Sequence, residues 1–91
     1  MGRLVGLLDE LAALLLAHSE ARWAEWVAKD AALVRRGDAY GLTHFLSAFG
    51  GMGSLNDMLL DPRSDEKRFH ALTSEAWTLA TALKREADAE G

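Results

Sequence analysis

Apolar residues recur along this chain at intervals of three and four positions, the spacing that places them on one face of an α-helix. Alternation of apolar and polar residues, which marks a half-buried strand, never persists. The pattern predicts four helices, over about residues 3–18, 20–36, 39–49 and 65–87. A further short turn is predicted at 58–60, ended by the Asp61-Pro62 pair. The expected fold is all-α, a compact bundle of four main helices with one extra short helical turn after a glycine-rich loop, in a single domain over residues 1–91.

Residues with known preferences for helix ends mark these boundaries. Ser19, Asp38 and Ser64 are expected to cap the second, third and last helices. Gly37 suits the left-handed position that follows the end of a helix. Ser54–Asp57 has the S-x-x-D form of a capping box, which would open the extra turn.

Composition and charge narrow the class of protein. The chain of 91 residues has no cysteine, which favours a reducing cytoplasm over secretion. Its longest apolar run, Leu11–Ala17, is too short to span a membrane. The net charge is −4 and the basic residues are scattered, so we expect no binding to nucleic acid or to an anionic membrane.

The segment Phe49–Asp57, FGGMGSLND, is the most unusual stretch. Neither the frame of a phosphate-binding P-loop nor the dinucleotide fingerprint fits it, because no strand precedes it and no lysine lies nearby. Turn chemistry explains each of its residues, which favours a structural corner. The alternative is a ligand site at exposed amides of the loop. The candidate ligand-binding residues are Asp30, Gly51, Gly53, Ser54, Asn56 and Asp57.

Asp30 is the second unusual residue, because a helical wheel places it in the middle of the apolar stripe of the second helix. A buried carboxylate requires hydrogen-bond donors. The glycine turn has backbone amides that no helix satisfies. A tryptophan indole or a neighbouring hydroxyl could also donate, but we expect Asp30 to be buried and to accept hydrogen bonds from amides between Gly51 and Leu55.

The three histidines do not form a recognisable site. His18 ends the first helix on its apolar face and is expected to bond to terminal carbonyls. His44 lies opposite the apolar stripe of the third helix and is expected to be exposed, and His70 lies off the stripe of the last helix. No pair has metal-ligand spacing, so no metal and no cofactor are expected, and no catalytic residue can be assigned.

The three tryptophans suggest where a partner could bind. Trp23 and Trp26 fall on the apolar stripe of the second helix and are expected in the core. Trp77 lies at the edge of the stripe of the last helix, a position that fits either the rim of the core or an interface, and a homodimer contact is expected there. A partner protein with basic residues could also be attracted by acidic side chains: Glu10, Glu20, Glu25 and Asp88.

The segments RWAEW, GDAYGL and LSAFGGMGSLNDMLL resemble those of a family of short bacterial domains of unknown function, over nearly the whole chain. The FGGMGSLND core is the specific part of this resemblance. The resemblance implies no activity and no site residues, and some relatives resemble immunity-type proteins that neutralise toxins. With no catalytic constellation in the sequence, a non-enzymatic protein-binding module, of immunity type, is the leading hypothesis. The alternative is a small-ligand binder or an enzyme with its site at the glycine loop.

Overall fold

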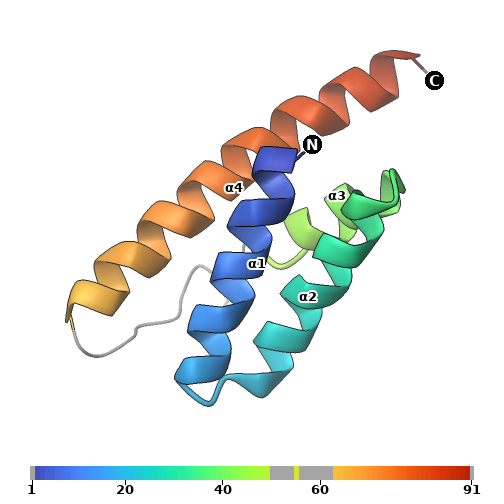
Figure 1. Cartoon of the computed structure of the whole chain (residues 1–91). Helices are drawn as coiled ribbons and strands as arrows, with labels where there is room; N and C mark the ends of the chain where they lie inside the picture. The colour runs from blue at the N-terminus through green and yellow to red at the C-terminus, as the bar shows by residue number, and fades with distance from the viewer. Residues whose placement is uncertain (1, 50–54, 56–62, 91) are drawn as a thin grey trace.

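Four helices account for nearly all of the chain that the structure describes. The computed structural model describes residues 2–49, 55 and 63–90. The helices are α1 (Gly2–Ala17), α2 (Ala21–Arg35), α3 (Tyr40–Leu46) and α4 (Arg63–Glu90) (Figure 1). No strand occurs among the described residues. The prediction of an all-α bundle of four main helices is confirmed.

The helices pack as a bundle whose members differ greatly in length. α1 and α2 form an antiparallel hairpin, α4 packs along α1, and α3 contacts both α2 and α4 (Figure 1). The longest helix, α4, has 28 residues. At a rise of about 1.5 Å per residue it is about 42 Å long, which equals the 42 Å long axis of the molecule. α3 has only 7 residues and covers a small part of that length.

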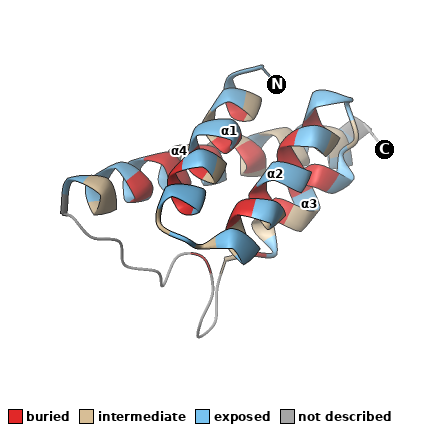
Figure 2. Cartoon of the chain, turned by 60° about the horizontal axis from the view of Figure 1, so that its bottom comes forward, coloured by how far each residue is buried: buried red, intermediate tan, exposed pale blue. Residues whose placement is uncertain are grey.

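Leucines of α1 form the centre of the core. The buried members of this helix are Leu4, Leu8, Leu11, Leu14 and Leu15, as the i, i+3, i+4 pattern predicts. They face buried side chains of the other helices: Val27, Ala31, Val34, Leu42, Phe45, Phe69, Leu72, Ala76 and Ala80. Figure 2 shows these buried positions turned toward the neighbouring helices. Each fully buried leucine contributes about 1.5–3 kcal/mol to stability.

Ser19 does not cap α2, which corrects the prediction. Its φ of 62° is left-handed. The Ser19 N–H donates to the Leu16 carbonyl at 3.0 Å and the Glu20 N–H to the Leu15 carbonyl at 2.9 Å. These two bonds form the Schellman motif that ends a helix. The reversal between α1 and α2 is so short that this serine must end the first helix rather than begin the second.

Gly37 ends α2 by the same motif, as predicted. Its φ is 79°, its N–H donates to the Val34 carbonyl at 2.9 Å, and the Asp38 N–H donates to the Leu33 carbonyl at 2.9 Å. The Asp38 carboxylate then accepts the Tyr40 N–H at 3.0 Å, which satisfies a free donor at the start of α3.

The predicted boundaries of the last two helices need correction. α3 ends at Leu46 rather than Phe49, because the chain tightens there: the Ala48 N–H donates to Phe45 and the Phe49 N–H to Leu46, each three residues back. α4 begins at Arg63, so Ser64 lies inside its first turn and is not the cap. α4 also continues to Glu90, beyond its predicted end at residue 87, and an ion pair between Lys84 and Asp88 at 2.9 Å supports that last part.

Several predictions concern residues outside the described ranges. They include the glycine turn, the capping box of Ser54–Asp57 and the extra helical turn at 58–60. Leu55 is the described member of this segment. Its side chain is fully buried, and its N–H donates to the Ala48 carbonyl at 2.9 Å. The segment is thereby anchored to the end of α3 at this residue.

Candidate functional site

Asp30 lies inside the core, as predicted, and its partner comes from α3. No part of Asp30 is exposed. Its Oδ1 atom is hydrogen-bonded to Nδ1 of His44. Among the amides predicted to donate to Asp30, that of Leu55 donates to the Ala48 carbonyl instead. The others lie outside the described residues, so for them the prediction is untested. Within the described chain, the other carboxylate oxygen, Oδ2, has no hydrogen-bond partner.

His44 is therefore not the exposed residue that the sequence pattern predicted. Only 17% of its side chain is exposed. The helical wheel gave α3 one buried stripe, but this helix contacts α2 on one side and α4 on another. A side chain opposite the stripe can therefore still face a neighbouring helix. The pair formed by Asp30 and His44 joins α2 to α3.

Gly41 allows α2 and α3 to approach closely enough for this contact. It is buried, and a Cβ atom at this position would lie 2.8 Å from Leu33 Cβ, 3.0 Å from Val34 Cγ2 and 3.1 Å from the Asp30 carbonyl oxygen. Distances this short require neighbouring atoms to move. The absence of a side chain is therefore what permits the close crossing of the two helices.

The environment of Asp30 changes its proton affinity. Burial raises the pKa of its carboxyl group from the ordinary 3.8 to about 6, because the charged form loses its hydration. The hydrogen bond and charge of His44, and the charge of Lys29, oppose this shift without cancelling it. When Asp30 is ionised, His44 Nδ1 donates its proton to the carboxylate, which fixes the orientation of the imidazole ring.

Aromatic rings surround His44 in a continuous group that we call the aromatic cluster: Trp23, Trp26, Tyr40 and His44. The rings of Trp26 and His44 stack with centroids 4.1 Å apart and planes at 19°. The ring centroids of Trp23 and Trp26 lie 5.4 Å apart, and those of Tyr40 and His44 lie 5.8 Å apart. The Trp26 indole N–H also donates to the His44 carbonyl at 3.2 Å. The central rings are therefore held by both stacking and hydrogen bonds.

The exposure of the cluster increases from its centre outward. Trp23 and Trp26 were expected in the core, but they are only partly buried and pack against its edge. Tyr40 is 56% exposed. The cluster is thus a surface feature with a buried carboxylate beneath it. The sequence signal that could have revealed it is the spacing of Tyr40 and His44, four positions apart on a helix that follows a buried acid.

The other two histidines contact carboxylate groups within the fold. Nε2 of His18 lies 2.9 Å from Oδ2 of Asp65, and this contact connects the end of α1 to the start of α4. It replaces the expected bond of the His18 side chain to terminal carbonyls. His70 lies 3.7 Å from Glu66 on the same helix. No group of three metal-ligating side chains is placed to hold an ion in the described ranges. None of the described helices is long and apolar enough to cross a membrane.

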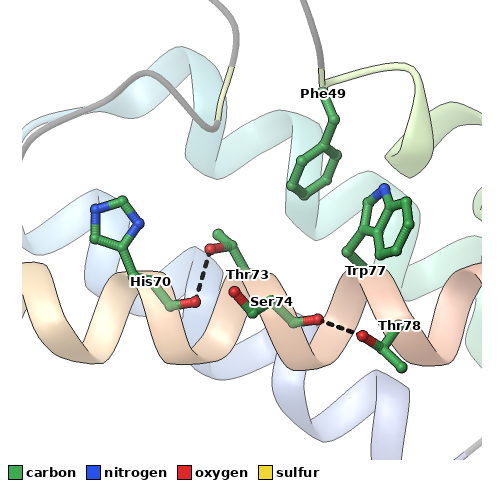
Figure 3. Close-up of a pocket in the computed structure, with 6 residues that line it drawn as sticks. All are labelled: Phe49, His70, Thr73, Ser74, Trp77 and Thr78. Carbon is green, nitrogen blue, oxygen red and sulfur yellow. Dashed lines mark hydrogen bonds between the residues drawn. The ribbon is translucent and has the colours of Figure 1, made fainter.

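A second surface feature, which we call the α4 hollow, lies beside Trp77. It has a volume of about 530 Å³ and is lined by Phe49, His70, Thr73, Ser74, Trp77 and Thr78 (Figure 3). Trp77 is 45% exposed, which agrees with its predicted place at the edge of the apolar stripe. The Thr78 hydroxyl donates to the Ser74 carbonyl at 3.0 Å, and the Thr73 hydroxyl donates to the Phe69 carbonyl at 2.9 Å.

The structure separates the predicted site residues. Asp30 is sealed in the core, whereas Gly51, Gly53, Ser54, Asn56 and Asp57 lie outside the described residues. Their proposed proximity is therefore untested. Two of the four acidic residues expected to attract a partner are paired within the chain: Glu10 with Arg68 at 3.6 Å, and Asp88 with Lys84 at 2.9 Å.

One comparison with known proteins gives a match. A family model described as a domain of unknown function, DUF6966, matches residues 16–70. No curated protein and no solved structure matches the chain significantly. The matched segment is more than half of the chain but shorter than the nearly full-length resemblance expected from the sequence. It contains Asp30 and the aromatic cluster, and it ends before Trp77.

Proposed function

The chain belongs to the DUF6966 family of domains of unknown function, and we propose that it is a non-enzymatic protein-binding module that presents the aromatic cluster to a partner. The observation that carries this proposal is the half-exposed Tyr40 beside the stacked rings of Trp26 and His44. Tryptophan and tyrosine are enriched among the residues that dominate binding energy at protein interfaces.

Pre-organisation of the cluster supports this role. The hydrogen bond to the buried Asp30 fixes the position of His44. Trp26 is fixed by stacking on the His44 ring and by the hydrogen bond from its indole N–H to the His44 carbonyl. Rings that are already fixed lose little conformational freedom when a partner binds. A surface of this kind suits recognition by shape more than it suits catalysis.

The partner that best fits the cluster carries arginine or lysine. Glu20 and Glu25 lie on either side of Trp23 in sequence, and the chain carries a net charge of −4. Cationic side chains bind the faces of tryptophan and tyrosine rings and are attracted by nearby carboxylates. In its finer form the proposal is an immunity-type role, in which the domain binds and blocks a basic toxin.

The burial of Asp30 argues against the alternative hypothesis, an enzyme with its site at the glycine loop. That hypothesis needed Asp30 in a pocket that reaches solvent, but Asp30 has no exposed surface. A general base must lie within hydrogen-bond reach of its substrate. The sealed position of Asp30 therefore favours a structural role for the carboxylate, as the support of the aromatic cluster.

Site-specific photo-crosslinking tests the proposed surface. A photoreactive amino acid would replace Tyr40 in one sample and Leu16, which is 64% exposed on α1, in the control. We expect crosslinks to a basic protein from the native host at position 40 and not at position 16. Tyr40→Ala should weaken binding of the purified partner by at least about tenfold. Equal labelling at both positions, or unchanged affinity of Tyr40→Ala, would refute the proposed surface.

The immunity-type form needs a separate measurement. If the captured protein is a toxin, adding the wild-type domain should abolish its activity, and Tyr40→Ala should restore it. A captured protein without toxic activity would remove the immunity-type reading and leave the binding surface intact.

A further inference from the structure

α4 is much longer than the helices that cover it. Arg3, in the first turn of α1, forms an ion pair with Glu75 at 2.7 Å, so α1 begins near the level of Glu75. The part of α4 beyond that level extends past the N-terminus of α1 (Figure 1). Trp77 lies at the start of this extended part. Such a large, half-exposed aromatic side chain at the edge of the buried face of a helix is typical of a contact surface.

The α4 hollow beside Trp77 has walls that can be buried at low cost. The hydroxyl groups of Thr73 and Thr78 are bonded to backbone carbonyls of their own helix (Figure 3). Covering Thr73 and Thr78 would therefore leave neither of their hydroxyl groups without a partner, which avoids the usual penalty for burying polar groups. The Phe49 ring completes the wall on the side away from α4.

Two opposite charges flank the hollow on the same side of α4. Glu66 and Lys84 lie 18 positions apart, which is about five helical turns, so they share one side of the helix. Glu75 is at their midpoint in sequence. If a second α4 ran antiparallel about a two-fold axis at that level, Glu66 of each helix would lie opposite Lys84 of the other.

The same register places the tryptophans in the hollows. Trp77 is two positions beyond the midpoint, so it would lie opposite Thr73 of the second copy, which lines that copy's hollow. We propose that this chain forms a two-fold homodimer through antiparallel α4 helices, with Trp77 of each copy in the α4 hollow of the other and Glu66 paired with Lys84 at both ends.

Charge complementarity favours a second copy as the occupant. One helix carries both members of the pair at equal distances from the axis, as an isologous interface requires. Within one chain, Glu66 lies 3.7 Å from His70, and Lys84 lies 2.9 Å from Asp88. Both Glu66 and Lys84 remain partly exposed, at 31% and 37%, so they can take a further partner. The dimer uses none of the residues of the aromatic cluster.

Sedimentation equilibrium of the full chain and its variants tests the dimer. We expect the wild type to dimerise at micromolar concentration and Trp77→Ala to raise the dissociation constant by about thirtyfold, as for a residue that dominates an interface. Tyr40→Ala is the matched aromatic control and should leave the dissociation constant unchanged. Circular dichroism of each variant establishes that the helices are retained.

Charge reversal gives the decisive comparison. Glu66→Lys and Lys84→Glu should each weaken the dimer, and the double variant should recover most of the lost affinity, because the pairs are restored in reverse. Glu86→Lys is the control, since it makes the same charge change as Glu66→Lys at an exposed position about 160° around the helix from Glu66. A wild type that stays monomeric at high micromolar concentration would overturn the proposal. So would a double variant as weak as the single variants, or equal weakening by Glu86→Lys.

Discussion

Two regions of this molecule place a tryptophan near a histidine, and the polar bonds around them differ in kind. In the aromatic cluster, the ring of Trp26 stacks on His44, and His44 binds the buried Asp30 of another helix. In the α4 hollow, Trp77 is 45% exposed and His70 pairs with Glu66 on its own helix. The bonds of the first region connect two helices, whereas those of the second stay within one.

This difference determines which region stabilises the fold and which region is available to bind a partner. Removing a member of the Asp30–His44 pair leaves a polar group stranded inside the protein, which is costly. Removing Trp77 or His70, the exposed rings of the α4 hollow, leaves only groups that water can reach. Thus the cluster contributes to the fold as well as to a surface, whereas the exposed rings of the hollow can change without loss of the fold.

The largest expected effect is that of His44→Ala. It leaves the Asp30 carboxylate buried without its partner, and breaking a buried ion pair in this way costs about 3–5 kcal/mol. Urea unfolding at pH 7 measures the loss. Tyr40→Ala, on the same helix and 56% exposed, is the control and should cost less than about 1 kcal/mol.

Asp30→Ala tests the same pair, but it removes the buried carboxylate instead of the carboxylate's partner. We expect a loss of about 2–4 kcal/mol, from the cavity and the lost hydrogen bond. If Asp30→Ala and His44→Ala both cost less than about 1 kcal/mol, the pair does not hold α2 to α3.

The next effect concerns pH. Because burial raises the pKa of Asp30 to about 6, the folded protein binds a proton more tightly at this group than the unfolded chain does. Its contribution to stability is therefore complete below the unfolded pKa of 3.8 and is lost as the pH rises through about 6. The groups that act on Asp30 are His44 and Lys29.

Asp30→Asn isolates this contribution, since the amide keeps the shape and cannot titrate. Relative to Asp30→Asn, the wild type should lose up to about 3 kcal/mol between pH 4 and pH 7, at about 1.4 kcal/mol for each unit of the shift. Urea unfolding of both proteins at unit intervals of pH gives this difference. A difference that stays constant would mean that Asp30 titrates in its ordinary range.

Much of this fold follows from the sequence because burial of leucine stripes dominates helix packing. The same pattern predicted that Asp30 is buried, since it lies within the stripe of α2. It failed for His44 because one helical wheel cannot show that the 7-residue α3 is packed on two sides. Ser19 was misread because its left-handed backbone is imposed by the short reversal between two helices, which a local preference for capping does not reveal.

The candidate site was less predictable than the fold. Asp30 requires a donor, but the sequence offers several, and the choice of His44 depends on how α2 and α3 cross. That crossing depends on Gly41, which the periodic pattern did not single out because it stands inside a helix. The site therefore depends on contacts between helices of different length. The periodic pattern of a single helix does not reveal such contacts.

Gly41→Ala tests this dependence and should have an intermediate effect. The added methyl group would meet Leu33 Cβ at 2.8 Å and Val34 Cγ2 at 3.0 Å, so α2 and α3 must separate or shift. Overpacking of this kind costs about 1–3 kcal/mol. Gly6→Ala, where the added atom meets nothing within 4 Å, is the control and should be neutral or slightly stabilising in a helix. A neutral Gly41→Ala would show that the crossing has room to relax.

The smallest effect on stability is expected for Trp77→Ala, although the residue is among the largest in the chain. Nearly half of its side chain already faces water, and its neighbours Thr73 and Thr78 keep their hydroxyl bonds to the backbone without it. We expect a loss below about 1 kcal/mol when the protein is unfolded at a concentration where it is monomeric. At higher concentration the loss should grow, because the wild-type dimer adds stability by mass action and the variant dimerises about thirtyfold more weakly. A loss comparable with that of His44→Ala at low concentration would place Trp77 in the core of the single chain, and the contrast between the two regions would disappear.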